Sequence, residues 1–164
     1  MVRIAVVSDT HMPRGARALP EACRERLQTA DLILHAGDVV AAYFLDELRA
    51  LGPPLQAVYG NMDEPALRAS LPKEQVIEVG QVRIGMVHIP GPIAGREQRL
   101  VARLPGCAAI VYGHTHVPQV EQHDGVWILN PGSPTERRKS PFRSMLELDV
   151  SGRKLAPRLV QLGT

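Results

Sequence analysis

Five short apolar segments of the chain each end in, or are directly followed by, an aspartate, an asparagine or a histidine. The segments cover residues 3–8, 32–38, 55–60, 82–88 and 107–113. The polar residues at their ends are Asp9 and His11, Asp38, Asn61, His88, and His114 and His116. Sites in open α/β sheets assemble outside the carboxyl ends of strands. If the five segments are strands, their polar residues are expected to converge.

The first half of the chain alternates apolar and amphipathic segments. The runs 3–8, 32–38 and 55–60 are short and rich in valine and leucine, which favours buried strands. A polar loop is expected over 9–17, and helical spacing predicts helices over 21–30 and 41–51. This order is typical of a parallel sheet with crossover helices.

The second half is richer in hairpins. Apolar pairs of segments flank Gly80-Gln81, Asp124-Gly125 and Ser151-Gly152, all of which favour tight turns. A helix is expected over 95–104 and a buried strand over 107–113. Two packed sheets with helices outside accommodate this mixture better than one doubly wound sheet does.

Composition limits the classes of function. The chain has 164 residues, 45% of them hydrophobic, which is most simply one domain, 1–164. A net charge of +2 without a long basic run, and an aromatic content of 4%, give no reason to expect extended nucleic acid or a membrane as partner. The two cysteines, Cys23 and Cys107, look like reduced, buried residues. Without a secretory leader or a long apolar run, the expected location is cytoplasmic.

The stretch from Ile110 to Val120, IVYGHTHVPQV, places two histidines at alternate positions. Residues i and i+2 of an extended segment project to the same side, so we expect His114 and His116 to face one site. For this stretch alone, two solvated histidines in a loop are an equally simple interpretation. Asp9 and His11 have the same spacing.

The ordered set D-x-H, G-D, G-N-x-D, H and G-H-x-H resembles the calcineurin-like metallophosphoesterase superfamily, and within it the small single-domain phosphodiesterases of bacteria and archaea. The resemblance extends from Arg3 through NPGSP at 130–134. It implies an α+β fold, an α/β/β/α four-layer sandwich of two packed mixed sheets flanked by helices, with two metal ions. It implies that one metal is held by Asp9, His11, Asp38 and His116, and the other by Asp38, Asn61, His88 and His114. Asp38 then bridges the two ions.

The donor chemistry agrees with that assignment. Carboxylate, imidazole and amide donors suit Mn²⁺, which we favour, and also Fe, Zn²⁺, Ni²⁺ or Co²⁺. Two divalent cations outweigh the charges of Asp9 and Asp38, so the centre attracts a phosphate, and the neutral Asn61 preserves that excess. The expected reaction is hydrolysis of a phosphoester, most simply a phosphodiester, by a hydroxide that the two metals activate. Asp38, Asn61 and His114 are expected to position that hydroxide.

The sequence departs from the family pattern after Asn61. Many members have a histidine there that protonates the leaving oxygen, whereas this chain has Met62, which has no proton to give. Asp63 is a candidate substitute acid, with a structural role as the alternative. Arg137 and Arg138 are candidates for binding substrate phosphate, with a solvated charge cluster as the alternative. The stretch 88–97 is expected to be a rigid loop, with a lid or substrate wall as the alternative.

Several functions therefore remain open. The leading one is a metal-dependent phosphodiesterase acting on a small phosphoester. A phosphomonoesterase or cyclic-nucleotide hydrolase would use the same residues. A different class is a non-catalytic protein-interaction scaffold, as in the retromer subunit that is similar to this family. The resemblance also leaves a homo-oligomer open.

Overall fold

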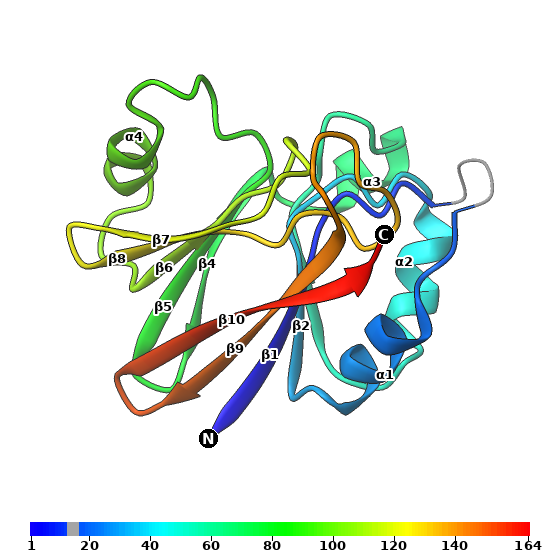
Figure 1. The fold of residues 1–164 in the computed structure, drawn as a ribbon, viewed down its shortest axis with the longest axis horizontal. Coiled ribbons are helices and arrows are strands. Elements are labelled where there is room, and N and C mark those ends of the chain that lie inside the picture. Colours follow the sequence, from blue (N-terminus) through cyan, green and yellow to red (C-terminus); the bar gives the residue numbers. More distant parts are fainter. Residues whose placement is uncertain (13–16) are drawn as a thin grey trace.

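The computed structural model of the chain describes residues 1–12 and 17–164, which form two five-stranded sheets packed face to face (Figure 1). Residues 13–16, within the loop predicted over 9–17, lie outside the described part. The first sheet has the order β10-β9-β1-β2-β3. Its strands are β1 (Val2–Val7), β2 (Leu32–His35), β3 (Leu55–Ala57), β9 (Arg143–Ser151) and β10 (Lys154–Gly163).

The second sheet has the order β4-β5-β6-β8-β7. Its strands are β4 (Glu74–Val79), β5 (Val82–Val87), β6 (Ala109–Val111), β7 (Gln119–His123) and β8 (Val126–Asn130). Both sheets are mixed. The predicted parallel set β1-β2-β3 is confirmed, as are the three antiparallel hairpins of the later segments.

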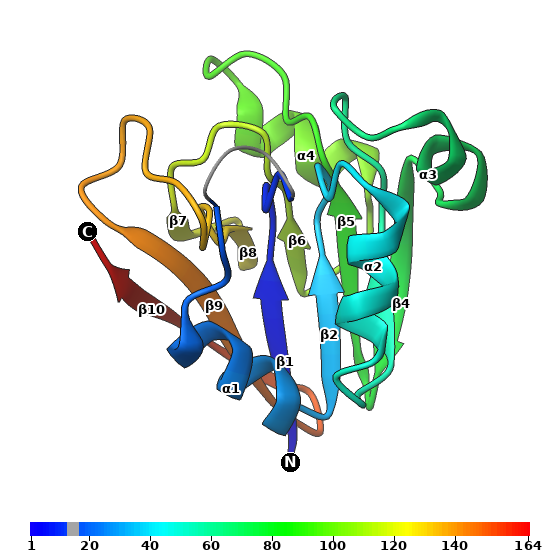
Figure 2. The same cartoon turned by 90° about the vertical axis from the view of Figure 1, so that its right-hand side faces the viewer.

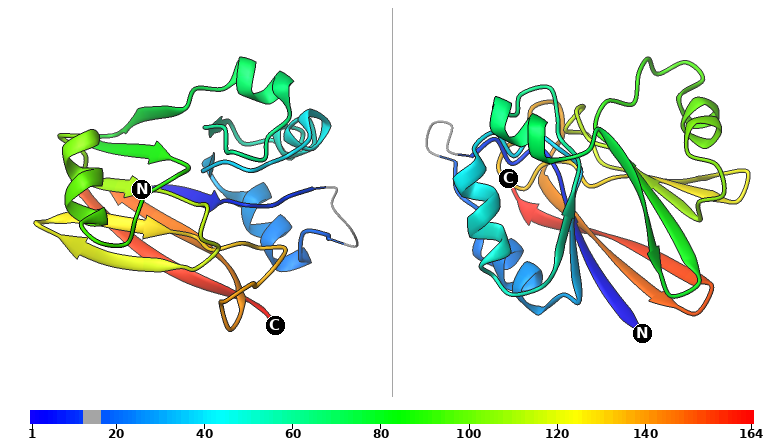
Figure 3. Two further views of the ribbon diagram at one scale, coloured as in Figure 1. Left: turned by 90° about the horizontal axis from the view of Figure 1, so that it is seen from above. Right: turned by 180° about the vertical axis from the view of Figure 1, so that it is seen from behind.

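Helices cover the outer face of each sheet. The described helices are α1 (Glu21–Thr29), α2 (Ala42–Arg49), α3 (Pro65–Ser70) and α4 (Arg96–Arg103). Figure 2 shows α1 and α2 in front of β1 and β2, and the view from behind in Figure 3 places α4 on the far side of the other sheet. The predicted α/β/β/α four-layer sandwich is confirmed.

Strand β1 shows why the sequences of the buried strands are continuous apolar runs. Ile4 and Val6 pack between the two sheets, whereas Ala5 and Val7 pack under the helices α1 and α2. Side chains alternate between the faces of a strand, so a strand that is buried on both faces needs an apolar residue at every position. A third cluster packs α4 against the outer face of the second sheet, around Leu100 and Ile110.

Three predicted strands are shorter than the sequence suggests. β2, β3 and β6 end at His35, Ala57 and Val111, several residues before the polar residues that follow them. The remaining apolar residues lie in the turns at this edge and are buried there, so hydrophobicity alone does not mark the strand end. The helix α3 was not predicted; it is a six-residue helix with proline in its first turn.

Both cysteines are buried and unpaired, as expected. None of the helices in the described part of the chain has the length and apolar character needed to span a bilayer.

Candidate metal centre

The seven residues predicted as metal ligands come together at one end of the two sheets. Asp9, His11, Asp38 and Asn61 follow β1, β2 and β3 of the first sheet, whereas His88, His114 and His116 follow β5 and β6 of the second. In Figure 2 the arrowheads of β1, β2 and β5 point toward the loops that carry them. The centre therefore lies across the junction between the sheets.

Two buried carboxylates form the middle of the cluster. Asp38 Oδ2 lies 3.3 Å from His11 Nε2 and 3.2 Å from His88 Nε2, so it stands between the two imidazoles. Asp9 Oδ1 lies 3.3 Å from His116 Nε2 and 3.8 Å from both His11 Nε2 and His88 Nε2. The sequence assigns Asp9 to one metal group alone, but the structure brings its carboxylate within reach of both groups.

The other two predicted ligands lie on the solvent side. Asn61 Oδ1 is 3.1 Å from His88 Nε2 and 3.2 Å from His114 Nδ1. Asn61 and His114 are exposed, whereas the five other predicted ligands are at most 2% exposed. The cluster thus has a buried half and a half open to a ligand from solution.

Hydrogen bonds behind the cluster fix which atoms face its centre. The backbone N–H of His114 and the Ser8 hydroxyl both donate to Asp9 Oδ2, at 3.0 and 2.7 Å. The backbone N–H of Met62 donates to Asp38 Oδ1 at 2.8 Å. His88 Nδ1 lies 2.8 Å from the Ala36 carbonyl oxygen and donates to it, so Nε2 is the ring nitrogen that faces the cluster.

The donor atoms that face inward fit a cation. Asp9 Oδ1 and His11 Nε2 are buried without a hydrogen-bond partner among the described residues, and such atoms call for an ion or a water. Asp9, His11 and His116 hold their ligand atoms within 4.8 Å of one another, and so do Asp9, Asp38 and His88. The mixed oxygen and nitrogen set suits first-row divalent ions.

The backbone at the ligands is strained. Five of the eight described non-glycine residues with left-handed φ are predicted ligands: Asp9 (57°), His11 (46°), Asp38 (60°), His114 (73°) and His116 (63°). Each such residue costs about 1–3 kcal/mol and persists where the surroundings enforce it, often at functional sites. The expectation that alternation in an extended segment aims His114 and His116 at one site is therefore wrong in its geometry, because both lie in a turn beyond β6.

Glycine precedes three of the ligands, Asp38, Asn61 and His114, because there is no room for a side chain; a Cβ at Gly37 would lie 2.6 Å from His88 Nδ1. A Cβ at Gly60 would collide with Asp38 Oδ1, and one at Gly113 would collide with Ser8 Oγ and lie 2.8 Å from Asp9 Oδ2. The loops that carry Asn61 and His114 therefore press directly on the two carboxylates. This close approach brings residues from both sheets into one cluster.

The charges within the cluster are strongly coupled. Burial alone would raise the pKa of Asp9 and of Asp38, but the neighbouring imidazoles hold both well below the usual range. Burial alone would lower the pKa of His11, yet the Asp38 and Asp9 carboxylates raise it to about 9. The carboxylates likewise raise the pKa of His88, so a cation bound at this cluster would compete with protons on His11 and His88.

The structure gives Asp63 a different role from the candidate acid. Its carboxylate accepts hydrogen bonds from the backbone N–H groups of Val40 and Gly60, both at 2.6 Å, and of Asp38 at 3.2 Å. Burial raises the pKa of Asp63, although these three donors oppose that effect. Both of its oxygens are committed to backbone, so Asp63 clamps the loops of Asp38 and Asn61 together and is not placed to protonate a leaving group.

Among the described residues, neither predicted arginine forms a hydrogen bond with a predicted ligand, and Arg138 is linked to His116 only through Glu136. Arg137 donates to the Pro141 carbonyl of its own loop at 3.4 Å, and Arg138 is bound to Glu136 at 2.7 Å. Only Arg138 lines a surface depression beside His114. The structure therefore favours the interpretation of a solvated charge cluster.

Glu136, from the same loop, is a residue that the sequence analysis missed. Its Oε1 lies 3.1 Å from His116 Nδ1, the ring nitrogen that faces away from Asp9, and it also pairs with Arg17. The contact is an electrostatic one, because its geometry is not that of a hydrogen bond. Metal-binding histidines commonly contact a carboxylate through their second nitrogen, which orients the ring. In the sequence Glu136 is a single acidic residue directly before Arg137 and Arg138, and it belongs to no recognisable motif.

A match to a family model and a search of curated proteins both relate this chain to metallophosphoesterases. Residues 2–153 match the family model described as calcineurin-like phosphoesterase superfamily domain. A probable metallophosphoesterase of Methanocaldococcus jannaschii is 36% identical over 162 residues, which cover 97% of this chain and 81% of the relative. A second, from Methanothermobacter thermautotrophicus, is 35% identical over 162 residues and covers 98% of this chain and 92% of the relative.

Solved structures share the fold. Vps29 of Chaetomium thermophilum superposes with a TM-score of 0.82 at 23% identity and covers 99% of each chain. Vps29 of Entamoeba histolytica, in complex with Zn²⁺, gives a TM-score of 0.78 at 24% identity over 98% of this chain and 99% of that one. A protein of Thermotoga maritima gives 0.78 at 30% identity over 99% and 100%.

We predict that Mn²⁺ stabilises the folded chain and that Asp38→Ala removes this effect. A ligand at about 100 times its Kd stabilises by about 2.7 kcal/mol, which raises the Tm of a chain of this size by about 5–10 °C. Thermal unfolding with Mn²⁺ and with a chelator measures the shift. Asp46→Ala, at a carboxylate whose side chain is 77% exposed, is the matched control and should keep it. An equal shift in Asp38→Ala would place the ion elsewhere.

We also predict that Glu136→Gln weakens Mn²⁺ binding by about 10- to 100-fold, because the His116 ring loses the charge that orients it. Titration against a fluorescent chelator measures the affinity. Glu121→Gln, at an exposed position on β7, serves as the control and should bind Mn²⁺ as the unaltered protein does. Unchanged affinity in Glu136→Gln would show that the contact with His116 is incidental.

Proposed function

This chain belongs to the calcineurin-like phosphoesterase superfamily, and from that premise we propose that it hydrolyses phosphodiesters with two divalent cations bound at the cluster around Asp38. The observation that carries the proposal is the convergence of ligand side chains from five strand ends, with Asp9 Oδ1 and His11 Nε2 buried at its centre without a hydrogen-bond partner in the described part of the chain.

The residues divide into two groups around a shared carboxylate. We propose that one cation is held by Asp9, His11, Asp38 and His116, and the other by Asp38, Asn61, His88 and His114. A pair of divalent cations, of which Mn²⁺ is our preference, supplies Lewis acidity and a water that is deprotonated near neutral pH. Distances from Asp38 Oδ2 to His11 and His88 of 3.3 and 3.2 Å support its role as the shared ligand.

The chain itself holds one oxygen of each carboxylate and leaves the other for a cation. Ser8 and the His114 N–H occupy Asp9 Oδ2, and the Met62 N–H occupies Asp38 Oδ1. These donors prevent the carboxylates from rotating, so their inward oxygens are oriented before a metal or substrate arrives. Such preorganisation reduces the rearrangement that the reaction itself would otherwise require.

The exposed side of the cluster is where a phosphate can enter. Asn61 and His114 line that side, and the neutral Asn61 amide adds no negative charge against an incoming anion. The substituents of the phosphate would extend toward solvent. A small phosphoester fits this opening, and a diester is our choice because of the resemblance to small single-domain phosphodiesterases.

A second candidate function is that of a protein-interaction scaffold. The observation that favours it is the fold shared with Vps29, one example of which was solved with a bound cyclic peptide, at 20% identity. A scaffold does not need a complete ligand set, whereas all seven ligand positions are filled here. We therefore rank catalysis first.

We predict that the Mn²⁺-loaded protein hydrolyses bis(p-nitrophenyl) phosphate and that Asp38→Ala lowers kcat/KM by at least about 10³-fold, because the shared ligand is lost. Release of p-nitrophenolate, followed by absorbance, gives the rate. Asp46→Ala should retain the full rate, and a chelator should abolish it. Turnover that persists in Asp38→Ala would contradict the proposed centre. The absence of turnover with Mn²⁺, Zn²⁺, Co²⁺ or Fe²⁺ would favour the scaffold.

We further predict a preference for esters with acidic leaving groups. The residue after Asn61 is Met62, which gives its backbone N–H to Asp38 and carries no acidic proton. A general acid contributes about 10²- to 10⁴-fold, and its absence matters least when the leaving group is a stable phenolate. Met62→His should therefore narrow the ratio of aryl to alkyl ester rates. Equal rates on p-nitrophenyl and methyl esters in the unaltered protein would show that another group supplies the proton.

A further inference from the structure

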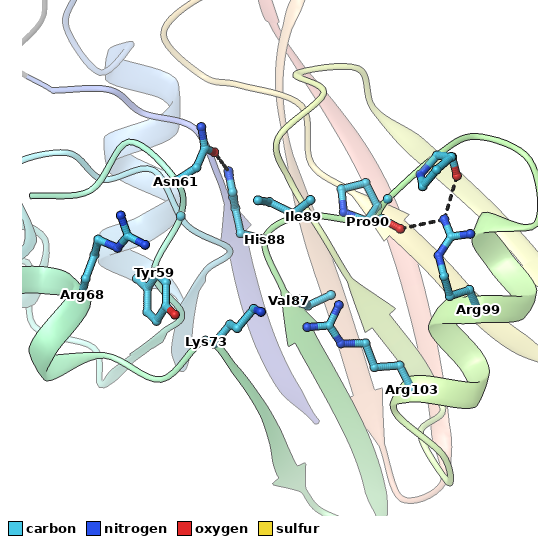
Figure 4. Close-up of a pocket in the computed structure, with 13 residues that line it drawn as sticks. Tyr59, Asn61, Arg68, Lys73, Val87, His88, Ile89, Pro90, Arg99 and Arg103 are labelled. Carbon is cyan, nitrogen blue, oxygen red and sulfur yellow. Dashed lines mark hydrogen bonds between the residues drawn. The ribbon is translucent and has the colours of Figure 1, made fainter.

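A cavity of about 500 Å³ opens directly beside the metal ligands Asn61 and His88. Figure 4 shows how it is built: Tyr59, Arg68 and Lys73 come from the segment around α3, and Arg99 and Arg103 come from α4. Val87, Ile89 and Pro90 provide apolar surface between these two sides. Because Asn61 and His88 belong both to the ligand cluster and to the cavity wall, a molecule bound at the cluster can extend into this cavity.

The charged side chains that line the cavity are all basic. Its described lining includes four basic side chains and no carboxylate. Arg103 pairs with Glu74 at 2.7 Å, and the Arg68 guanidinium lies over the ring of Tyr59, 5.4 Å from its centroid. Neither Arg68 nor Lys73 forms an ion pair within the described residues. Two basic groups without a counter-charge at a concave surface, Arg68 and Lys73, favour an anion.

The depression on the other side of His114 differs in this respect. Arg96, Arg138 and Lys139 line it together with Glu97 and Glu121. Its charges are mixed, so it offers an anion less net attraction. The sequence suggested Arg137 and Arg138 for substrate phosphate, whereas the structure offers a more uniformly basic surface elsewhere.

The wall of the cavity is fixed by α4. The Arg99 guanidinium donates to the carbonyl oxygens of Pro90 and Pro92, at 3.0 and 2.7 Å, and Arg96 donates to that of Gly91 at 2.9 Å. These bonds support the expectation of a rigid loop over the stretch that begins at His88. The cavity is thus preformed, and binding there needs no ordering of the loop.

We propose that this basic cavity, defined by Tyr59, Arg68, Lys73 and Arg103, binds a second anionic group of the substrate while the scissile phosphate lies at the metal centre. The inference rests on the proposed function and narrows its substrate class. The favoured substrate is an ester in which a phosphate or carboxylate is carried on an apolar or aromatic body. Lys73 and Arg68 are its binding residues, and Ile89 and Pro90 face its apolar part.

Two pairs of non-hydrolysable phosphonates test the proposal. Phenylphosphonate is compared with benzene-1,4-diphosphonate, and 4-biphenylphosphonate with biphenyl-4,4′-diphosphonate, so that two spans are sampled. Each is titrated by calorimetry into the Mn²⁺-loaded protein. The diphosphonate of at least one pair should bind about tenfold more tightly, because charge-assisted hydrogen bonds from basic residues to phosphonate are strong. Ratios below about threefold in both pairs would overturn the proposal, since two equivalent ends alone give a factor of about two.

Variants locate the effect. The double substitution Arg68→Gln with Lys73→Met should bring the ratio below about threefold. Lys154→Met, on β10 and outside the basic cavity, is the matched control and should retain the full ratio. A preference that survives the double substitution would place the second anion elsewhere and overturn the proposal.

The proposed function is judged separately by hydrolysis of bis(p-nitrophenyl) phosphate. If the protein hydrolyses this ester but binds each diphosphonate no more tightly than its monophosphonate, the proposal for the basic cavity is wrong and the proposed function stands. If the protein binds diphosphonates more tightly but hydrolyses no ester, the cavity is an anion site and the proposed enzymatic function is wrong.

Discussion

The structure depends on two carboxylates, Asp9 and Asp38, buried side by side at one end of the fold. Like charges in a desolvated place are costly unless opposite charge lies between them. Three buried imidazoles supply part of that charge and hold the pKa of both aspartates low. Asp9 Oδ1 has no hydrogen-bond partner among the described residues, and a cation bound there would offset the rest of the cost.

That cluster exists because two sheets meet. The first sheet contributes Asp9 and Asp38 and the second contributes His88 and His116, so no single βαβ unit holds the centre. The apolar core between the sheets therefore sets the distances between ligands. A change in sheet packing would move the two groups of ligands relative to each other, and this links the stability of the core to the chemistry at its edge.

The loops at this edge store strain that the surroundings maintain. Left-handed backbone at five ligands is held by tight contacts, among them Gly60 against Asp38 and the clamp of Asp63. From the opposite side, Ser133 donates to the Asp9 carbonyl at 2.9 Å and Thr135 to the Thr10 carbonyl at 2.8 Å. These contacts are made by the chain itself, so the geometry is preorganised, which fits a hydrolytic centre better than a surface that adapts to partners.

The sequence by itself determined the layers and the ligand candidates. A continuous apolar run such as that of β1 indicates a strand covered on both faces, and hence a sheet between two other layers. Polar residues that follow neighbouring parallel strands are expected at the same edge of the sheet. It could not determine how those residues are aimed. Alternation gave the wrong geometry for His114 and His116, because both have left-handed backbone in a segment that contacts from both sheets hold in place. The clamp of Asp63, the Glu136–His116 contact and the basic cavity beside His88 also depended on tertiary structure, since each joins segments whose distance in space has no signature in local sequence.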